Sequence, residues 1–185
     1  ILATDGASVS ISPPEQEVQP GDTFTIDVLV DADGFDLKGI DVEVSYDSDV
    51  MTTSAAQIEA HNLLDGMEIG PTVTDGKVRY AVAATTATPG VSDSFMTIEF
   101  TMNDDAAPGD YDLTITRADL ADENNDPVPD VEINDGTVTI PGVGGPEVSI
   151  LPPEQQVKAG GTFTIDVWVD ADGFDLKGID VEVSY

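Results

Sequence analysis

An internal repeat constrains the fold of this chain more than any other feature of its sequence. Residues 8–46 return as residues 147–185 at a constant offset of 139 positions, and of the 39 aligned pairs 7 differ and 32 are identical. A repeat unit of roughly 135 residues has the length of one ordinary domain. The chain is therefore modular, and each copy of the unit is expected to build its own core.

The repeat divides the chain into a complete module at 1–140, a linker at 141–146 and an incomplete second module at 147–185. Two prolines bracket three glycines and a valine in the linker, a composition typical of a short connector. A sandwich fragment as short as the second copy does not bury its own apolar face. Two hypotheses follow: the polypeptide continues with further repeats, or the segment completes the sheet of a neighbouring molecule.

Alternating apolar and polar residues predict half-buried β-strands along the first module. Residues 23–30 and 40–46 alternate most clearly, and further alternating segments follow up to residue 140. Glycine next to proline or aspartate supplies turn signals between these segments. The pattern predicts an all-β protein, an antiparallel sandwich or jelly roll, with one short helix over residues 54–64.

The strongly acidic charge excludes several kinds of function. The chain has 37 acidic and 6 basic residues and a formal net charge of −31, whereas a nucleic-acid-binding surface needs clustered lysine and arginine. The charge also disfavours docking on anionic lipid, and the sequence has no run of ~18 apolar residues that would predict a membrane span. High salt screens such self-repulsion, so the composition points to a halophilic archaeon or to an acidic calcium-binding protein from ordinary seawater.

The sequence predicts that the protein is not an enzyme. It has one histidine, His61, and no cysteine, so no nucleophile is accompanied by an evident general base. Pairs of carboxylates are expected by chance among so many acids, and no aromatic-rich groove accompanies them. The same lack of clustered aromatic residues disfavours carbohydrate binding.

Five motifs in the first module resemble, in order, those of a cohesin domain. They occupy residues 20–26, 39–47, 75–84, 107–111 and 134–140. The resemblance covers about residues 8–140 and, by repetition, 147–185. It implies a jelly-roll sandwich of about nine strands, a secreted or cell-surface location, and non-catalytic binding of dockerins on one sheet face. On that analogy, the partner-binding residues on or near this face are Asp41, Glu43, Lys77, Arg79, Thr97 and Glu99.

Two acidic loops, the first at residues 119–126 and the second at residues 31–36, are candidate Ca²⁺ sites, because Ca²⁺ prefers several oxygen ligands. In the first loop, the side chains at 122, 124 and 126 follow the i, i+2, i+4 spacing that opens an EF-hand loop, although the glycine and final glutamate of that motif are missing. The alternatives are a polar turn in the first loop and a hairpin-like turn in the second, which recurs at 170–175. The candidate ligands are Asp119, Asp122, Asn124 and Asp126 in the first loop and Asp31, Asp33 and Asp36 in the second.

One of the seven differences between the copies suggests an interface. Leu29 of the first copy is replaced by Trp168 in the second, at a position that the alternation places outward. Large exposed apolar side chains are enriched at interfaces, which makes Leu29 and Trp168 candidate partner-binding residues. Packing under a loop or the short helix is the alternative.

Two functions are consistent with these features. The first is self-assembly with copies of the same chain into an extracellular fibre, surface layer or adhesive stalk, stabilised by Ca²⁺ and by strand donation between subunits. The near-identical repeat, the short linker and the acidic surface favour it. The second is a scaffold that binds dockerin-bearing secreted proteins, and this function follows from the family resemblance alone.

Overall fold

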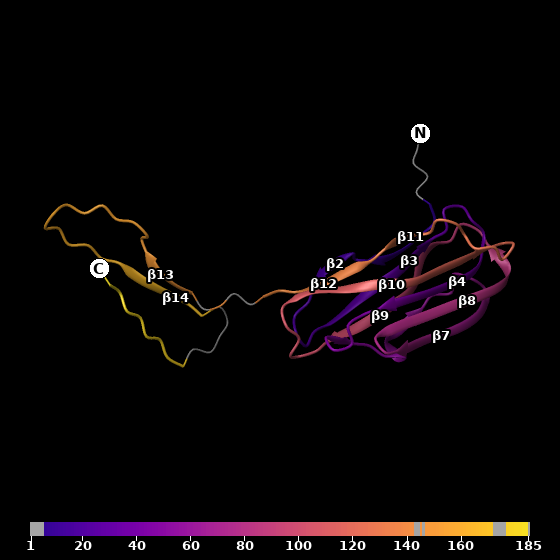
Figure 1. The fold of residues 1–185 in the computed structure, drawn as a ribbon, viewed down its shortest axis with the longest axis horizontal. Helices are drawn as coiled ribbons and strands as arrows, with labels where there is room; N and C mark the ends of the chain where they lie inside the picture. The colour runs from indigo at the N-terminus through magenta and orange to yellow at the C-terminus, as the bar shows by residue number, and fades with distance from the viewer. Residues whose placement is uncertain (1–5, 143–144, 146, 172–176, 185) are drawn as a thin grey trace, which may run out of the picture. The chain divides into compact units, whose positions relative to one another are not determined.

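Alternation along the chain builds an almost purely β structure. The computed structural model describes residues 6–142, 145, 147–171 and 177–184. The chain divides into two compact units, Ile1–Pro141 and Gly142–Tyr185. The strands of the first unit (Figure 1) are β1 (Ser8–Ser12), β2 (Glu15–Glu17), β3 (Thr23–Asp31), β4 (Leu37–Ser45), β5 (Met51–Thr52), β6 (Ile58–Ala60), β7 (Gly66–Thr74), β8 (Lys77–Thr88), β9 (Ser92–Met102), β10 (Gly109–Asp122), β11 (Glu132–Asn134) and β12 (Gly136–Ile140).

These strands form the two sheets of a sandwich. One sheet has the order β11-β1-β3-β9-β5, with β6 also paired to β9, and the other has the order β2-β12-β10-β4-β8-β7. Pairing is antiparallel except between β1 and β11 and between β2 and β12. The predicted antiparallel jelly-roll sandwich is confirmed. The described strands of this unit number twelve rather than about nine, because four of them are segments of only two or three residues.

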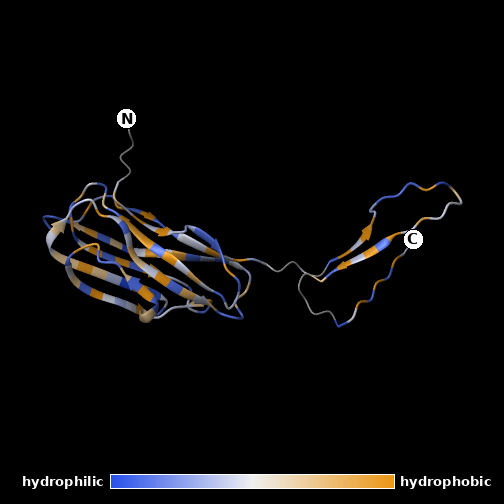
Figure 2. Cartoon of the chain, turned by 180° about the vertical axis from the view of Figure 1, so that it is seen from behind, coloured by the Kyte–Doolittle hydropathy of each residue, from blue (hydrophilic) through white to orange (hydrophobic). Residues whose placement is uncertain are grey.

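The core lies between the two sheets and is built from the inward-facing half of each alternating strand. In β3 the apolar residues Phe24, Ile26 and Val28 are buried, while the polar residues between them face outward or lie half-buried. The resulting alternation of hydrophobic and hydrophilic bands is visible along the strands of the first unit (Figure 2). Phe100 connects the two sides of the core, since its ring lies 5.4 Å from that of Phe24 and 5.0 Å from that of Tyr46.

The predicted helix over residues 54–64 is wrong. Its first turn is a single 3₁₀ turn, η1 (Ala55–Gln57), and the chain then continues as β6. Ile58 is buried and pairs with Ile98 of β9, so tertiary pairing overrides the local helix propensity of this alanine-containing segment. Among the described residues, no helix is long and apolar enough to cross a membrane.

The second unit repeats the first pairing of the first unit. β13 (Glu147–Leu151) pairs with β14 (Asp166–Asp170), and each of the five pairs equals a β1–β3 pair shifted by 139 residues. The surroundings differ, however. Val9 and Ile11 are 0% and 3% exposed in β1, whereas their equivalents Val148 and Ile150 are 52% and 42% exposed in β13. The described part of the second copy therefore has the local structure of the module without its buried core.

Candidate partner-binding face

The candidate site lies on the outer side of four neighbouring strands of the second sheet, in the order β10-β4-β8-β7. Because side chains alternate along a strand, burial of Ile40, Val42 and Val44 turns Asp41 and Glu43 of β4 outward. The neighbouring strands bring basic residues to the same side: Glu43 is paired with Arg79 of β8 and with Arg117 of β10. We call this surface the β10-β4-β8-β7 face.

A β-bulge in β10 decides what that strand contributes to the face. The register of β10 against β4 shifts between Ile115 and Arg117. Ile115 is buried, and strict alternation would turn Arg117 inward as well, but the extra residue reverses the alternation. Arg117 and Asp119 consequently face outward beside Asp41, where the side chain of Arg117 is 44% exposed.

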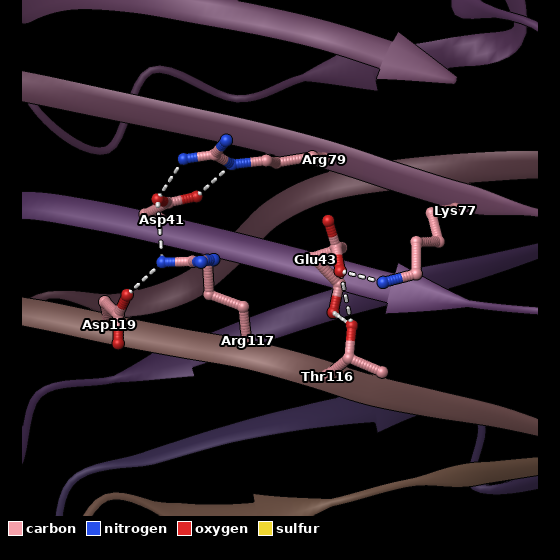
Figure 3. A network of polar contacts seen from close by, with 7 residues as sticks. All are labelled: Asp41, Glu43, Lys77, Arg79, Thr116, Arg117 and Asp119. Carbon is pink, nitrogen blue, oxygen red and sulfur yellow. Dashed lines mark hydrogen bonds and ion pairs between the residues drawn. The ribbon is translucent and has the colours of Figure 1, made fainter. Parts of the chain in front are cut away.

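The carboxylate of Asp41 lies between two guanidinium groups (Figure 3). Arg79 donates from Nε to Oδ1 over 2.9 Å and from Nη2 to Oδ2 over 2.6 Å, a two-pronged geometry that suits arginine and carboxylate. Nη1 of Arg117 lies 3.7 Å from Asp41 Oδ2 and donates to Asp119 Oδ2 over 2.6 Å. The hydrogen bonds from Arg79 to Asp41 raise the pKa of Arg79, which keeps the guanidinium charged.

Glu43 forms the second half of the network. Its Oε1 accepts from Lys77 Nζ over 2.7 Å and from the Thr116 hydroxyl over 2.8 Å. The hydrogen bond from Lys77, and then that from Thr116, lower the pKa of Glu43. The network thus spans three adjacent strands and consists of Asp41, Glu43, Lys77, Arg79, Thr116, Arg117 and Asp119.

The network balances its own charge in a strongly acidic chain. It contains three of the 6 basic residues of the protein together with three acidic ones, while the whole chain has a formal net charge of −31. An isolated exposed ion pair contributes about 0–1 kcal/mol to stability, whereas a two-pronged arginine–carboxylate pair within a network is the case in which ion pairs do stabilise a fold. Half of the basic residues of the chain thus lie on one sheet face of the first unit.

Sequence reasoning placed six partner-binding residues on or near one face, and the structure separates them into two groups. Asp41, Glu43, Lys77 and Arg79 lie together on the β10-β4-β8-β7 face. Thr97 and Glu99 lie on β9, which belongs to the other sheet. There Thr97 donates to Asp27 Oδ1 over 2.5 Å and lies 3.0 Å from His61 Nε2, and Glu99 accepts from Gln57.

Asp119 of the network was predicted as a calcium ligand rather than as a partner-binding residue, and two further members, Thr116 and Arg117, were not predicted at all. Both come from the strand with the β-bulge, and the alternation of β10 does not reveal on which side its residues lie after the shift. Basic residue type is the one signal that could have found Arg117, because basic residues are scarce in this chain.

The first candidate calcium loop is held by hydrogen bonds within the chain. Asp122 Oδ1 accepts from the backbone N–H of Asn124 over 2.8 Å and of Asp126 over 2.9 Å, and the bond from Asp126 contributes most to lowering the pKa of Asp122. Asp119 points to Arg117 in the ionic network instead.

The second candidate loop is similarly bonded. Asp31 accepts from the backbone N–H of Asp33 over 2.9 Å and from the Ser92 hydroxyl over 3.0 Å, and Asp36 is exposed. The copy of this loop at 170–175 falls largely on residues 172–176, outside the described residues. Within the described part of the chain, no three histidine, aspartate or glutamate side chains are placed to hold a metal together. Calcium binding stays a prediction.

Leu29 and Trp168 occupy equivalent strand positions in different surroundings. Leu29 is half-buried on β3, opposite Ser10 of β1 and next to a register shift against β9. Trp168 of β14 is 61% exposed and lies opposite Ser149. Leu29 thus lies on the sheet opposite to the ionic network, and its role as a contact residue stays a prediction, as does that of Trp168.

Comparison with known proteins gives one family and a set of similar folds. The model of the Cohesin domain family matches residues 9–140. A chain of a type I cohesin–dockerin complex from Clostridium thermocellum superposes with a TM-score of 0.61 at 16% identity, over 74% of this chain and 99% of that chain.

Two further structures superpose as well. A non-cellulosomal cohesin from the archaeon Archaeoglobus fulgidus gives a TM-score of 0.59 at 15% identity, over 74% of this chain and 92% of that chain. The cohesin CaCohA2 from Clostridium acetobutylicum gives a TM-score of 0.60 at 24% identity, over 75% of this chain and 94% of that chain. At these identities the superpositions establish the fold alone. No curated protein is detectably similar in sequence.

Proposed function

Because its residues 9–140 match the family model, the chain belongs to the cohesin family, and we propose that its β10-β4-β8-β7 face binds the dockerin modules of other proteins. Cohesin domains are non-catalytic protein-interaction modules, so the module binds a partner and catalyses no reaction. A similar chain comes from a cohesin–dockerin complex. These findings support the scaffold hypothesis better than self-assembly.

The charge-balanced network is the observation that supports this face over the rest of the module. Arg79, Lys77 and Arg117 have side chains that are 44–48% exposed, and fixed carboxylates hold them in place. Their outer edges can donate to acceptors on a partner, while the overall repulsion between two acidic proteins is locally cancelled. The opposite sheet presents Asp27, Glu99 and other acids instead.

Isothermal titration calorimetry of the purified chain against each dockerin module encoded in the source genome tests this proposal. We expect at least one to bind, and we expect Arg79→Glu to weaken that binding by about tenfold or more, because it places like charges beside Asp41. The matched control is Glu99→Lys on the opposite sheet, which should change the affinity less than about twofold. Binding by none, or equal binding by Arg79→Glu, contradicts the proposal.

A secreted or cell-surface location accompanies this function, since a scaffold must meet its partners outside the cell. We expect antibodies against the first unit to detect the protein in the culture medium or on intact cells. Detection only after cell lysis would contradict this location.

The near-identical repeat, the short linker and the acidic surface support self-assembly with strand donation as a second candidate function. In the described part of the second copy, side chains equivalent to core residues of the first copy are exposed, among them Phe163 at 61% and Ile179 at 59%. Burial of these side chains against another copy of the chain would constitute self-assembly. Sedimentation velocity with and without Ca²⁺ measures it: concentration-dependent growth supports assembly, and a monomer at all concentrations in both conditions rejects it.

A further inference from the structure

The β10-β4-β8-β7 face carries an apolar groove at the end away from Lys77. One row of residues crosses four strands here, because the register pairs Met67 with Ala83, Ala83 with Gly39, and Gly39 with Ala121. Three of these four side chains have at most one carbon atom, and the groove that results has a volume of about 570 Å³. Large side chains at these positions would leave no such hollow.

The rim of the groove is unusually apolar for so acidic a protein. Ile69, which lines the groove, is 53% exposed, and Met67, which pairs with the lining residue Ala83, is 66% exposed. Both lie on the edge strand β7. Only one other large apolar residue is comparably exposed in the described part of the first unit, namely Ile133 on the opposite sheet. Exposed aliphatic residues beside a hollow of small residues are typical of a binding site rather than of a solvated surface.

The groove is continuous with the ionic network, because Asp41 and Asp119 belong to both. A partner that covers the network therefore covers the groove as well. A central apolar pocket bordered by charged residues is also the usual composition of a protein interface.

We propose that this groove receives one bulky apolar side chain of the dockerin, an inference that rests on the function proposed above. Ala83 and Arg79 are four residues apart on β8, which corresponds to about 13 Å along a strand. The complementary partner therefore carries an aliphatic or aromatic side chain about 13 Å from a carboxylate or hydroxyl that accepts from the arginines. Two different anchors at that separation fix the orientation of the dockerin on the face.

Three substitutions test the groove. Ala83→Leu fills it at an exposed position, and Ile69→Ala removes part of its rim. Ile133→Ala is the matched control, an equally truncated isoleucine outside the face. With the dockerin that binds most tightly, calorimetry should show a loss of about tenfold for Ala83→Leu, a smaller loss for Ile69→Ala and a change below about twofold for Ile133→Ala.

The outcomes separate this inference from the proposed function. If Arg79→Glu loses binding while Ala83→Leu and Ile69→Ala bind as the wild type does, the groove proposal is overturned and dockerin binding on this face stands. If no dockerin binds at all, the proposed function is overturned, and the dockerin is removed as the occupant of the groove.

A small probe tests the preference of the groove without any partner. Cyclohexanol, titrated into the ¹⁵N-labelled chain, should shift the amide signals of Gly39, Ala83 and Ala121 in the wild type. The same signals should move much less in Ala83→Leu. Signals that stay unchanged in the wild type would overturn an apolar site here, whatever the dockerins do.

Discussion

At the scale of single residues, Asp41 and Glu43 organise the ionic network, because each accepts hydrogen bonds from a side chain of a neighbouring strand. Asp41, Glu43, Lys77 and Arg79 each occupy an outward position of a clear strand, and the structure brings all four together. Arg117 could not be placed in this way, because its orientation depends on a bulge that leaves no pattern in the sequence. Thr97 and Glu99 also alternate outward, but alternation does not say to which sheet a strand belongs.

The lowered pKa of Glu43 predicts how this network depends on pH. The pKa of Glu43 is lower in the folded state than its ordinary value of 4.5, so ionised Glu43 stabilises the fold at any pH above 4.5. This stabilisation is lost as the pH falls through the lower, folded-state pKa. We expect urea unfolding to show a difference in stability between wild type and Glu43→Gln at pH 6 that shrinks towards pH 3. A difference that grows on acidification would contradict the hydrogen bonds assigned to Glu43.

Phe100 tests the aromatic part of the core. Its side chain is 0% exposed and contacts the rings of Phe24 and Tyr46. We expect Phe100→Ala to lower the free energy of unfolding by about 3–5 kcal/mol, from lost burial and the cavity left behind. Urea denaturation measures it, and a loss below about 1 kcal/mol would show that these rings do not pack as described.

At the scale of elements, the clearly alternating strands were predictable, whereas the edge strand β7 was not predicted and the predicted helix is wrong. Alternation over 23–30 and 40–46 predicts β3 and β4, whereas start and stop signals alone predict the helix over residues 54–64. The pairing of Ile58 with Ile98, 40 positions away in the sequence, then determined their structure. Local patterns do not contain such a long-range contact.

The hairpin between β7 and β8 provides a test at this scale. Asp75 and Gly76 have φ values of 50° and 73°, the left-handed conformation that a two-residue hairpin turn requires. A Cβ on Gly76 would lie 2.8 Å from the carbonyl oxygen of Tyr46, whereas a Cβ on Gly34, with a φ of 87°, would contact nothing within 4 Å. Both Gly→Ala changes incur the backbone cost of about 1–2 kcal/mol.

Only Gly76→Ala should show a further loss in urea denaturation, because only this residue meets the carbonyl of Tyr46. Gly34→Ala is the control for the backbone cost alone. Equal losses in the two variants would contradict the close approach at Gly76.

At the scale of the whole molecule, the net charge and the internal repeat were visible in the sequence, but the distribution of charged residues over the surface was not. A net charge of −31 predicts self-repulsion, and the structure shows that three of the 6 basic residues lie together on one face of the first unit. The apolar groove was not predicted either, since Gly39, Ala83 and Ala121 are far apart in sequence and meet only through strand register.

The charge also gives a prediction for salt and calcium. We expect the melting temperature to rise with NaCl, because screening weakens the repulsion between carboxylates. If the first acidic loop binds calcium, CaCl₂ should raise the melting temperature of the wild type more than NaCl does at the same ionic strength. The Asp122→Ala variant should lack this additional rise. Equal melting temperatures in NaCl and CaCl₂ at matched ionic strength would reject calcium binding.

The central claim is that the β10-β4-β8-β7 face, and not the opposite sheet, binds the partner. Amide hydrogen exchange of the chain, free and saturated with the dockerin that binds it, measures this most directly. The account predicts increased protection along β4, β8 and β10 around Asp41, Arg79 and Arg117, and little change along β3 and β9 around Asp27 and Glu99. Protection concentrated on β3 and β9 would contradict it.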